Sequence, residues 1–520
     1  GWNYVIMPIM RTMLQYPLMT TLFTAAIFIP PAALADYKDD TGFTMLSEEL
    51  GAEMPDGSYI GVSQIEAAEP PDNTYYMPDR SNSAFSGKII VNETGSSTGI
   101  SSHATSVGRH FYGNTDSFTP DTDSIAVFEA NNWIGPGFLN TLASAPPEIE
   151  TNSVQNHSWI GSSSNAVEML RRLDFAVNRD GFTAVTGVNN GWSTNIPQLL
   201  SQCYNSISVG CSHGNHSAGE TTIDLPGRLK PEITAPLSTT SLSVPITASA
   251  CALLKDKAVS SLSLSNALYP ESIKAILLAG ATKDEFSSWE RTASRPLDTR
   301  FGAGELNIYN SYHVLISGEN ESNPSNLVQK KGWDFGLIRP QSNAVYFFSV
   351  PQDSAMTRFS AVLTWNRIVT DGPGAGFDPV PFVPRMEMRL YRAADFQAGD
   401  LLDLSTSAVD NVQHVYQKNL SAGDYLLQIS SKNTNNYAVA WNSRTALIPE
   451  FKAINTKALP ANFKASVSSN FPYAIEACTS LILQQWIALA TNSSETNILE
   501  YTDTNSTNFF KRFYRLRPDP

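Results

Sequence analysis

The chain has few charged side chains and no cluster of positive ones. Charged residues make up 16% of its 520 residues, and its formal net charge at pH 7 is -14. Proteins that bind nucleic acid neutralise phosphates with grouped Lys and Arg side chains, so this composition argues against a nucleic-acid partner. The hydrophobic share of 42% and the aromatic share of 10% argue against disorder, and the length predicts two or three folded domains.

Cysteine is scarce as well, with four residues in the whole chain. Cys203 and Cys211 are close enough in sequence to form a disulfide in an oxidising compartment, whereas Cys251 and Cys478 have no obvious mates. One disulfide and four free thiols are equally compatible with this spacing. No C-x-x-C pair or His/Cys spacing indicates zinc, and no D-x-D-x-D-G loop indicates a calcium site, so no cofactor is assigned from motifs.

The chain also lacks an uninterrupted apolar run long enough to span a bilayer. In residues 10–35 one arginine precedes an apolar stretch that three prolines interrupt and that ends in Ala33-Leu34-Ala35. A membrane helix needs about 20 consecutive apolar residues, whereas a shorter stretch ending in small residues is typical of a secretory signal. We interpret residues 1–35 as a signal-peptide region cleaved before Asp36. This predicts a secreted protein, extracellular or periplasmic, with no membrane attachment after signal removal.

The pattern of apolar residues changes near residue 315. Before it, strand-like runs such as "GVSQIEA", "SIAVFEA" and "NSISVGC" alternate with amphipathic helical segments at 164–181 and after Pro270, which predicts an α/β domain over 36–315 with a parallel sheet flanked by helices. Beyond it, alternating strands without helices predict an antiparallel β-sandwich at 316–448 and a small β module at 449–520.

One serine lies where a nucleophile would be expected. Ser241 falls in "KPEITAPLSTTSLSVPITASACALL" (230–254) and precedes a predicted helix with Pro245 in its first turn, where a missing N–H does no harm. A helix N-terminus offers free N–H groups and a positive dipole end to a developing oxyanion. A nucleophilic hydroxyl also needs a base, a group that orients the base, and oxyanion donors.

This segment resembles the nucleophile motif of the subtilisin-like serine proteases, in which K-P-D, A-P and G-T-S-x-A-x-P recur in that order. "SSHATSV" is similar to the family's histidine motif, and "AVTGVNNG" is similar to its oxyanion motif. The resemblance covers about residues 55–315. It implies a subtilisin-like fold, polypeptide substrates, His103 as the base and Asn189 as an oxyanion donor, with Asn190 facing away.

The carboxylate that orients the base has two candidates. Glu66 ends an apolar strand 37 residues before His103, a separation close to the family's habit, whereas Glu93 in "IIVNETG" lies only ten residues before it. We favour Glu66, although the family usually carries aspartate. The order of acid, histidine and serine is then that of the subtilisin family, and order distinguishes the convergent triads.

The resemblance also implies a substrate cleft and leaves the metal question open. "VQNHSWIGSSS" is similar to the family's cleft-lining strand, which would place Ser158, Trp159, Ile160 and Gly161 beside the substrate backbone for strand addition. Calcium is common in the family, so a structural calcium ion is possible here without residues attached to it. The β-rich C-terminal region is similar to the jelly-roll modules that often follow such proteases.

Three departures from the family pattern support a different interpretation. Thr239 and Ala104 replace glycines, and a glutamate replaces the aspartate. A catalytically degenerate secreted protein that binds ligands or acts as a scaffold on the same fold is therefore the alternative. An esterase of the α/β-hydrolase type is disfavoured, because the chain has neither a G-x-S-x-G elbow nor the order serine, acid, histidine.

Overall fold

The computed structural model describes residues 36–70, 74–95, 99–455, 460–482, 485–509 and 511–519. The predicted signal-peptide region, residues 1–35, therefore lies outside the described residues. Within the described part of the chain, no helix is both long and apolar enough to cross a membrane.

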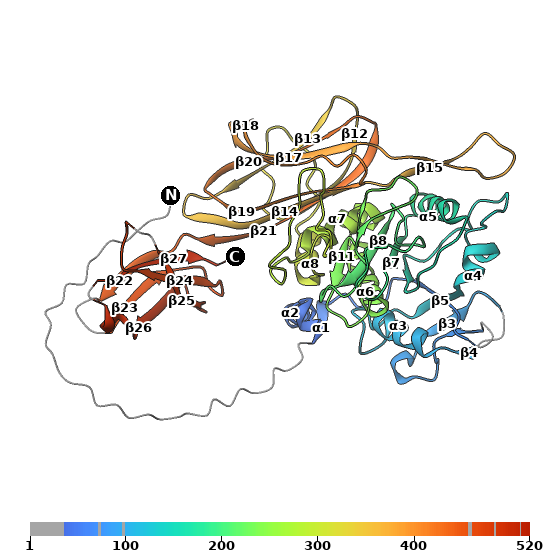
Figure 1. The fold of residues 1–520 in the computed structure, drawn as a ribbon, viewed down its shortest axis with the longest axis horizontal. Coiled ribbons are helices and arrows are strands. Elements are labelled where there is room, and N and C mark those ends of the chain that lie inside the picture. Colours follow the sequence, from blue (N-terminus) through green and yellow to red (C-terminus); the bar gives the residue numbers. More distant parts are fainter. Residues whose placement is uncertain are drawn as a thin grey trace.

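A seven-stranded parallel sheet forms the centre of the first half of the chain (Figure 1). Its strands β1, β6, β7, β8 and β11 are buried along their whole length, as expected for a parallel sheet covered on both faces. The strands lie in the order β11 (Ile233–Ala235), β8 (Ser206–Cys211), β7 (Thr183–Gly187), β6 (Val154–His157), β1 (Val62–Glu66), β5 (Ser124–Glu129) and β3 (Ile89–Asn92). The predicted α/β class is confirmed.

The order of the strands locates a crevice at one edge of the sheet. The chain builds β1, β3 and β5 toward one side and then crosses back to add β6, β7, β8 and β11 on the other side of β1. The order therefore reverses between β1 and β6. In open parallel sheets, ligands bind outside the carboxyl ends of the strands at such a reversal.

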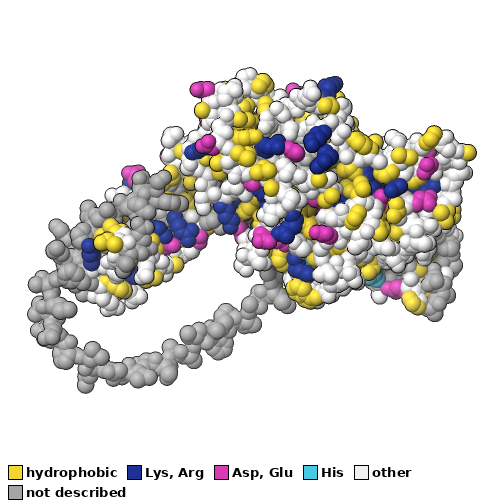
Figure 2. Space-filling model, turned by 45° about the horizontal axis from the view of Figure 1, so that its top comes forward, with side chains coloured by type: hydrophobic (Ala, Val, Ile, Leu, Met, Phe, Trp, Pro, Cys, Tyr) yellow, Lys and Arg dark blue, Asp and Glu magenta, His cyan; other side chains and the backbone are white. Residues whose placement is uncertain are grey.

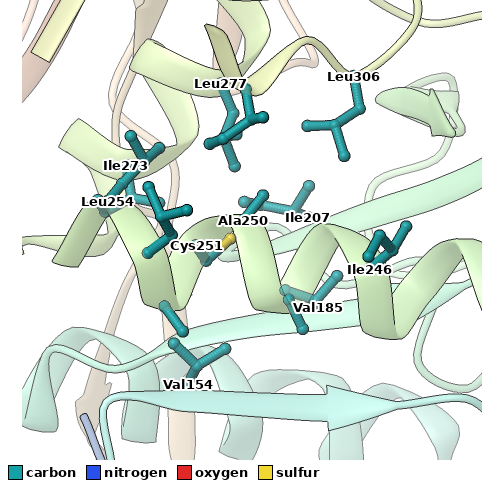
Figure 3. Packing of buried hydrophobic residues seen from close by; sticks show 14 of the residues in the cluster. Val154, Val185, Ile207, Ile246, Ala250, Cys251, Leu254, Ile273, Leu277 and Leu306 are labelled. Atoms are coloured by element: carbon teal, nitrogen blue, oxygen red, sulfur yellow. The ribbon is translucent and has the colours of Figure 1, made fainter. Parts of the chain in front are cut away.

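Helices cover both faces of this sheet. Helix α6 (Thr240–Val259) is buried except near its two ends and packs against β6, β7 and β8, with its N-terminal end toward the carboxyl ends of the strands (Figure 3). The other helices are α1 (Tyr37–Asp40), α2 (Phe43–Leu50), α3 (Ser102–Tyr112), α4 (Ala130–Asn132), α5 (Ala166–Asp180), α7 (Pro270–Gly280) and α8 (Ile308–Ile316). The short pairs β2 (Tyr75–Met77) with β4 (Gly99–Ile100) and β9 (Gly219–Glu220) with β10 (Leu229–Lys230) lie outside the main sheet.

The second half of the chain is antiparallel, as predicted. One sheet of the sandwich contains β12 (Gly332–Ile338), β21 (Asn435–Leu447), β14 (Ser354–Thr364) and β19 (Val412–Leu420), and the other contains β13 (Asn343–Val350), β20 (Gly423–Ser431), β17 (Met386–Ala394) and β18 (Gln397–Ser405). The hairpin of β15 (Ile368–Asp371) and β16 (Pro379–Phe382) reaches from the sandwich to α5, and α7 packs against β14 and β21.

A last module of two three-stranded sheets follows and lies to one side of the rest (Figure 1). It contains β22 (Glu450–Asn455), β23 (Ala461–Ser466) and β26 (Ile498–Asp503) in one sheet, and β25 (Ile487–Asn492), β24 (Tyr473–Cys478) and β27 (Phe513–Pro518) in the other. All four cysteines are buried and free, so Cys203 and Cys211 form no disulfide in this structure. On the face drawn in Figure 2, Lys and Arg side chains are scattered among acidic ones.

Candidate active site

The buried carboxylate of Glu66 and the partly exposed imidazole of His103 form a hydrogen-bonded pair. Glu66 is the last residue of β1 and is fully buried. His103 lies in the first turn of α3, a helix that Ser101 caps by accepting the Ala104 N–H at 2.9 Å. Oε2 of Glu66 lies 2.9 Å from Nδ1 of His103. The acidic residue thus occupies the carboxyl end of the strand at the reversal point, and it binds the Nδ1 edge of the imidazole.

Two side chains that sequence analysis missed hold Glu66 in place. Nε2 of Gln64 donates to Oε1 of Glu66 at 2.8 Å and to the carbonyl of Ala104 at 2.9 Å. The Tyr112 hydroxyl donates to Oε1 of Gln64 at 2.5 Å. Residues i and i+2 of a strand share a face, so the polar Gln64, two positions before Glu66 in the same strand, was the available indication of this network.

The pair with Glu66 sets the protonation behaviour of His103. The hydrogen bond that His103 donates to Glu66 raises the pKa of the imidazole, and burial opposes the rise. Because Glu66 accepts the hydrogen bond, the neutral ring carries its proton on Nδ1 and leaves the lone pair of Nε2 free. In this tautomer the imidazole can accept a proton at Nε2.

The alternative carboxylate, Glu93, follows a strand two positions away from β1 in the sheet. It follows the edge strand β3, its side chain is exposed, and its main-chain N–H bonds to the carbonyl of Val127 at 2.9 Å. His103 is bonded to Glu66. His110, further along α3, bonds the carbonyl of Ser106 at 2.9 Å and packs against the ring of Tyr37, which is a structural arrangement.

Ser241 lies in the first turn of α6, whereas the sequence analysis placed it just before the helix. The helix already starts at Thr240, so Pro245 lies inside it and not in its first turn. The helix begins after Thr239, and Oδ1 of Asn190 accepts the Thr240 N–H at 2.9 Å and the Thr240 hydroxyl at 3.1 Å. The Ser241 N–H is one of the groups that a helix N-terminus leaves without an internal partner. Thr239 has φ -141° and ψ 155°, an extended conformation open to any residue, so the missing glycine introduces no backbone strain here.

Ser241 and Asn189 line one small cavity. Its volume is about 50 Å³, and its walls include Gly187, Val188 and the segment 158–160. Ser217 fixes the backbone of Asn189 from the neighbouring loop, accepting its N–H at 2.9 Å and donating to its carbonyl at 2.8 Å. Asn190 lines the same cavity, so the expectation that it faces away is wrong. It instead caps the helix that carries Ser241.

The predicted cleft segment divides into two parts. Ser158, Trp159 and Ile160 follow β6 and line the cavity with Ser241, although Trp159 is only 8% exposed and also belongs to a core cluster. Gly161 exchanges main-chain hydrogen bonds with Leu199 at 3.1 and 3.0 Å. Those groups are therefore already paired, which leaves residues 158–160 to face a bound chain.

The hydrogen bond expected between His103 and Ser241 is not formed. Among the described residues, neither Nε2 of His103 nor Oγ of Ser241 has a hydrogen-bond partner. The carboxyl ends of the parallel strands bring these groups to one edge of the sheet. Glu66 ends β1 and binds His103, Asn189 follows β7, and α6 begins at the same edge. Catalytic hydrogen bonds are often long before a substrate binds, so this arrangement is compatible with a base and a nucleophile that approach on binding.

No metal site accompanies these groups in the described part of the chain, where no three His, Cys, Asp or Glu side chains are grouped to hold an ion. We therefore name no ligands for the structural calcium ion that the family resemblance allows.

No family model and no curated protein matches this chain. Among solved structures, it is similar to the epidermin leader peptide processing serine protease of Staphylococcus aureus (12% identity, TM-score 0.37, covering 55% of this chain and 82% of the other). It is also similar to fervidolysin of Fervidobacterium pennivorans, a keratinolytic enzyme related to subtilisin (11%, 0.34, 90% and 78%). A third similar structure is the psychrophilic subtilisin-like protease Apa1 of Pseudoalteromonas sp. AS-11 (10%, 0.34, 54% and 97%).

Proposed function

We propose that this protein is a secreted serine endopeptidase of the subtilisin type that hydrolyses peptide bonds through Ser241. The observation that carries the proposal is the 2.9 Å bond between the buried carboxylate of Glu66 and Nδ1 of His103. A fully buried carboxylate is costly unless it is paired and hydrogen-bonded. Here its partner is a half-exposed imidazole with a free Nε2, at the sheet edge where ligands bind.

The proposed reaction is acyl transfer in two stages. Ser241 Oγ attacks the substrate carbonyl carbon while Nε2 of His103 takes the hydroxyl proton, and the same proton then goes to the leaving amine. A water molecule repeats these steps on the acyl-enzyme and releases the acid. Glu66 keeps the neutral imidazole in the tautomer that accepts at Nε2 and stabilises the imidazolium that forms.

Two donors are available for the oxyanion. The free Ser241 N–H points out of the first turn of α6, and Asn189 lines the same cavity with its backbone fixed by Ser217. In our proposal the side-chain amide of Asn189 and this N–H stabilise the developing charge, while residues 158–160 pair with the substrate backbone. The substrates are accordingly polypeptides.

A fluorophosphonate probe tests the proposal, because it reacts with activated serine hydroxyls. We expect labelling of the folded protein that Ser241→Ala abolishes. Ser243→Ala is the matched control: this serine is fully buried two residues on, and its hydroxyl donates to the carbonyl of Ala235 at 3.3 Å, so the variant should label normally. Absence of labelling in folded protein would instead support the degenerate scaffold. Peptide products that vanish in Ser241→Ala would establish endopeptidase activity.

A further inference from the structure

A second cavity lies between the helices of the first domain and the β-sandwich, remote in sequence from Ser241. Its volume is about 310 Å³, within the range of small-molecule sites, roughly 300 to 1,000 Å³. One wall is the start of α8, with its N-cap Asn307, and the other comes from β14 and β21 (Figure 1). We call it the seam cavity.

The seam cavity is lined by more positive than negative groups. Lys331, Arg358 and Arg444 line it, and Asp284 is the one carboxylate among the described lining residues. Asp284 pairs with Arg358 and is 39% exposed. Among the described residues, neither Lys331 nor Arg444 forms an ion pair. Two positive charges therefore lack an ion-pair partner in a chain whose net charge is -14, although the Arg444 guanidinium lies over the ring of Phe471, 4.3 Å from its centroid.

These cations disfavour one another in the absence of an anion. Burial lowers the pKa of Lys331, and Arg444 lowers it further, while Glu49 offsets the shift only as the smallest contribution. Burial likewise lowers the pKa of Arg444, and Arg358 adds to the effect, while the carboxylate of Asp284 partly offsets it. Each charge is thus held at a cost that a bound anion would remove.

One of the residues that line the cavity also carries an unused donor. The side chain of Arg358 is nine-tenths buried, and its Nε atom has no hydrogen-bond partner among the described residues. A buried donor without a partner costs roughly 1 to 3 kcal/mol, so such groups call for an explanation. The first turn of α8 adds the positive end of a helix dipole to the same space, which favours an anion there.

We propose that the seam cavity binds a small tetrahedral dianion, for which inorganic phosphate is the probe. The two guanidinium groups offer planar pairs of donors that match phosphate oxygens, and the Lys331 ammonium adds a point charge. Lys331 and Arg444, the two lining cations without an ion pair among the described residues, match a charge of minus two. Because Arg358 and Arg444 belong to the sandwich and α8 to the first domain, the bound anion links the two parts.

The test uses the full chain carrying Ser241→Ala, so that self-cleavage and catalysis play no part. Calorimetric titration with phosphate, at ionic strength matched by sodium chloride, should show saturable binding, and the thermal unfolding temperature should rise with phosphate as linkage requires. Lys331→Gln should weaken binding at least about tenfold by removing one charge next to the anion. Lys418→Gln, an exposed lysine of β19 outside the cavity, should leave binding unchanged.

The outcomes separate the proposal from general salt effects. Phosphate excluded from protein surfaces stabilises any folded protein, so an equal unfolding shift in the parent, Lys331→Gln and Lys418→Gln without calorimetric saturation would overturn the proposal. Acetate binding as tightly as phosphate would overturn the dianion assignment. Without phosphate, Lys331→Gln should be at least as stable as the parent. Arg444→Lys keeps the charge but loses the planar pair, and unchanged phosphate affinity in a folded variant would also contradict the proposed geometry.

Discussion

Replacing Glu66 by glutamine should stop the reaction by reversing the tautomer of His103. In the structure, Oε1 of Glu66 faces a donor, the amide nitrogen of Gln64, at 2.8 Å, and Oε2 faces Nδ1 of His103 at 2.9 Å. Gln64 cannot turn round, because its oxygen accepts the Tyr112 hydroxyl and its nitrogen also donates to Ala104. A glutamine at position 66 must therefore present its oxygen to Gln64 and its NH₂ group to His103.

The imidazole then has to accept at Nδ1, so its proton moves to Nε2, the nitrogen that should receive the serine proton. The equivalent exchange in a serine protease triad lowers kcat about 10⁴-fold, which corresponds to about 5 kcal/mol of transition-state stabilisation. We expect a loss of this size in fluorophosphonate labelling rate and peptide hydrolysis, with an unchanged circular dichroism spectrum. Glu93→Gln, at an exposed turn, should behave like the parent.

A second substitution isolates the cause. In Glu66→Gln combined with Gln64→Met, no donor forces the orientation of the new amide, so its oxygen can accept from Nδ1 and restore the productive tautomer. The double variant should recover at least about tenfold in rate over Glu66→Gln, or about 1.4 kcal/mol. Near-normal rates in Glu66→Gln, or a double variant slower than the single one, would refute this reasoning.

Three further expectations concern the same site. Asn189→Ala should lower kcat by about 10²- to 10³-fold with little change in KM, since the amide acts on the oxyanion; steady-state kinetics measure this split. Because the hydrogen bond to Glu66 raises the pKa of His103, rates should increase with pH through a midpoint above 6.5, the ordinary value for histidine, and Glu66→Gln should move that midpoint down. Thr239→Gly should keep the labelling rate within about threefold, because residue 239 is already extended and relieves no strain.

Much of the fold follows from local sequence. The runs rich in Val and Ile became β1, β5, β7 and β8, and the helical segment at 164–181 became α5, which ends at Gly181 with φ +77°. Helix α7 starts at Pro270, where proline fits the first turn. These elements carry their start and stop information in adjacent residues, so pattern analysis finds them.

Other elements depend on contacts that no local pattern reveals. Helix α1 has four residues and no buried side chain. Helix α8 mixes polar and apolar residues, and which of them are buried is decided by the elements that it packs against. Glu232 shows the same limit: it is fully enclosed and pairs with Lys230 at 3.0 Å and with Lys274 of α7 at 2.8 Å. From sequence alone, charged side chains at such positions are expected on the surface, because their ion-pair partners come from distant parts of the chain.

The candidate site divides in the same way. Ser241, His103 and Asn189 are placed by motifs because each follows or begins a recognisable element, whereas Gln64, Tyr112 and Ser217 act through partners 28 to 48 residues away. Sequence analysis could not find the seam cavity, because its two arginines come from strands β14 and β21 of the sandwich and its helix end comes from α8 of the first domain.

The departures from the family pattern do not by themselves argue for lost activity. Thr239 adopts an extended conformation that needs no glycine. Ala104 is fully buried within α3, and its N–H and carbonyl both bond to partners around the Glu66 pair. The longer side chain of Glu66 still reaches His103 at 2.9 Å. Because each substitution is accommodated, the choice between enzyme and scaffold depends on one remaining step, the approach of Nε2 of His103 to the Ser241 hydroxyl when a substrate is bound.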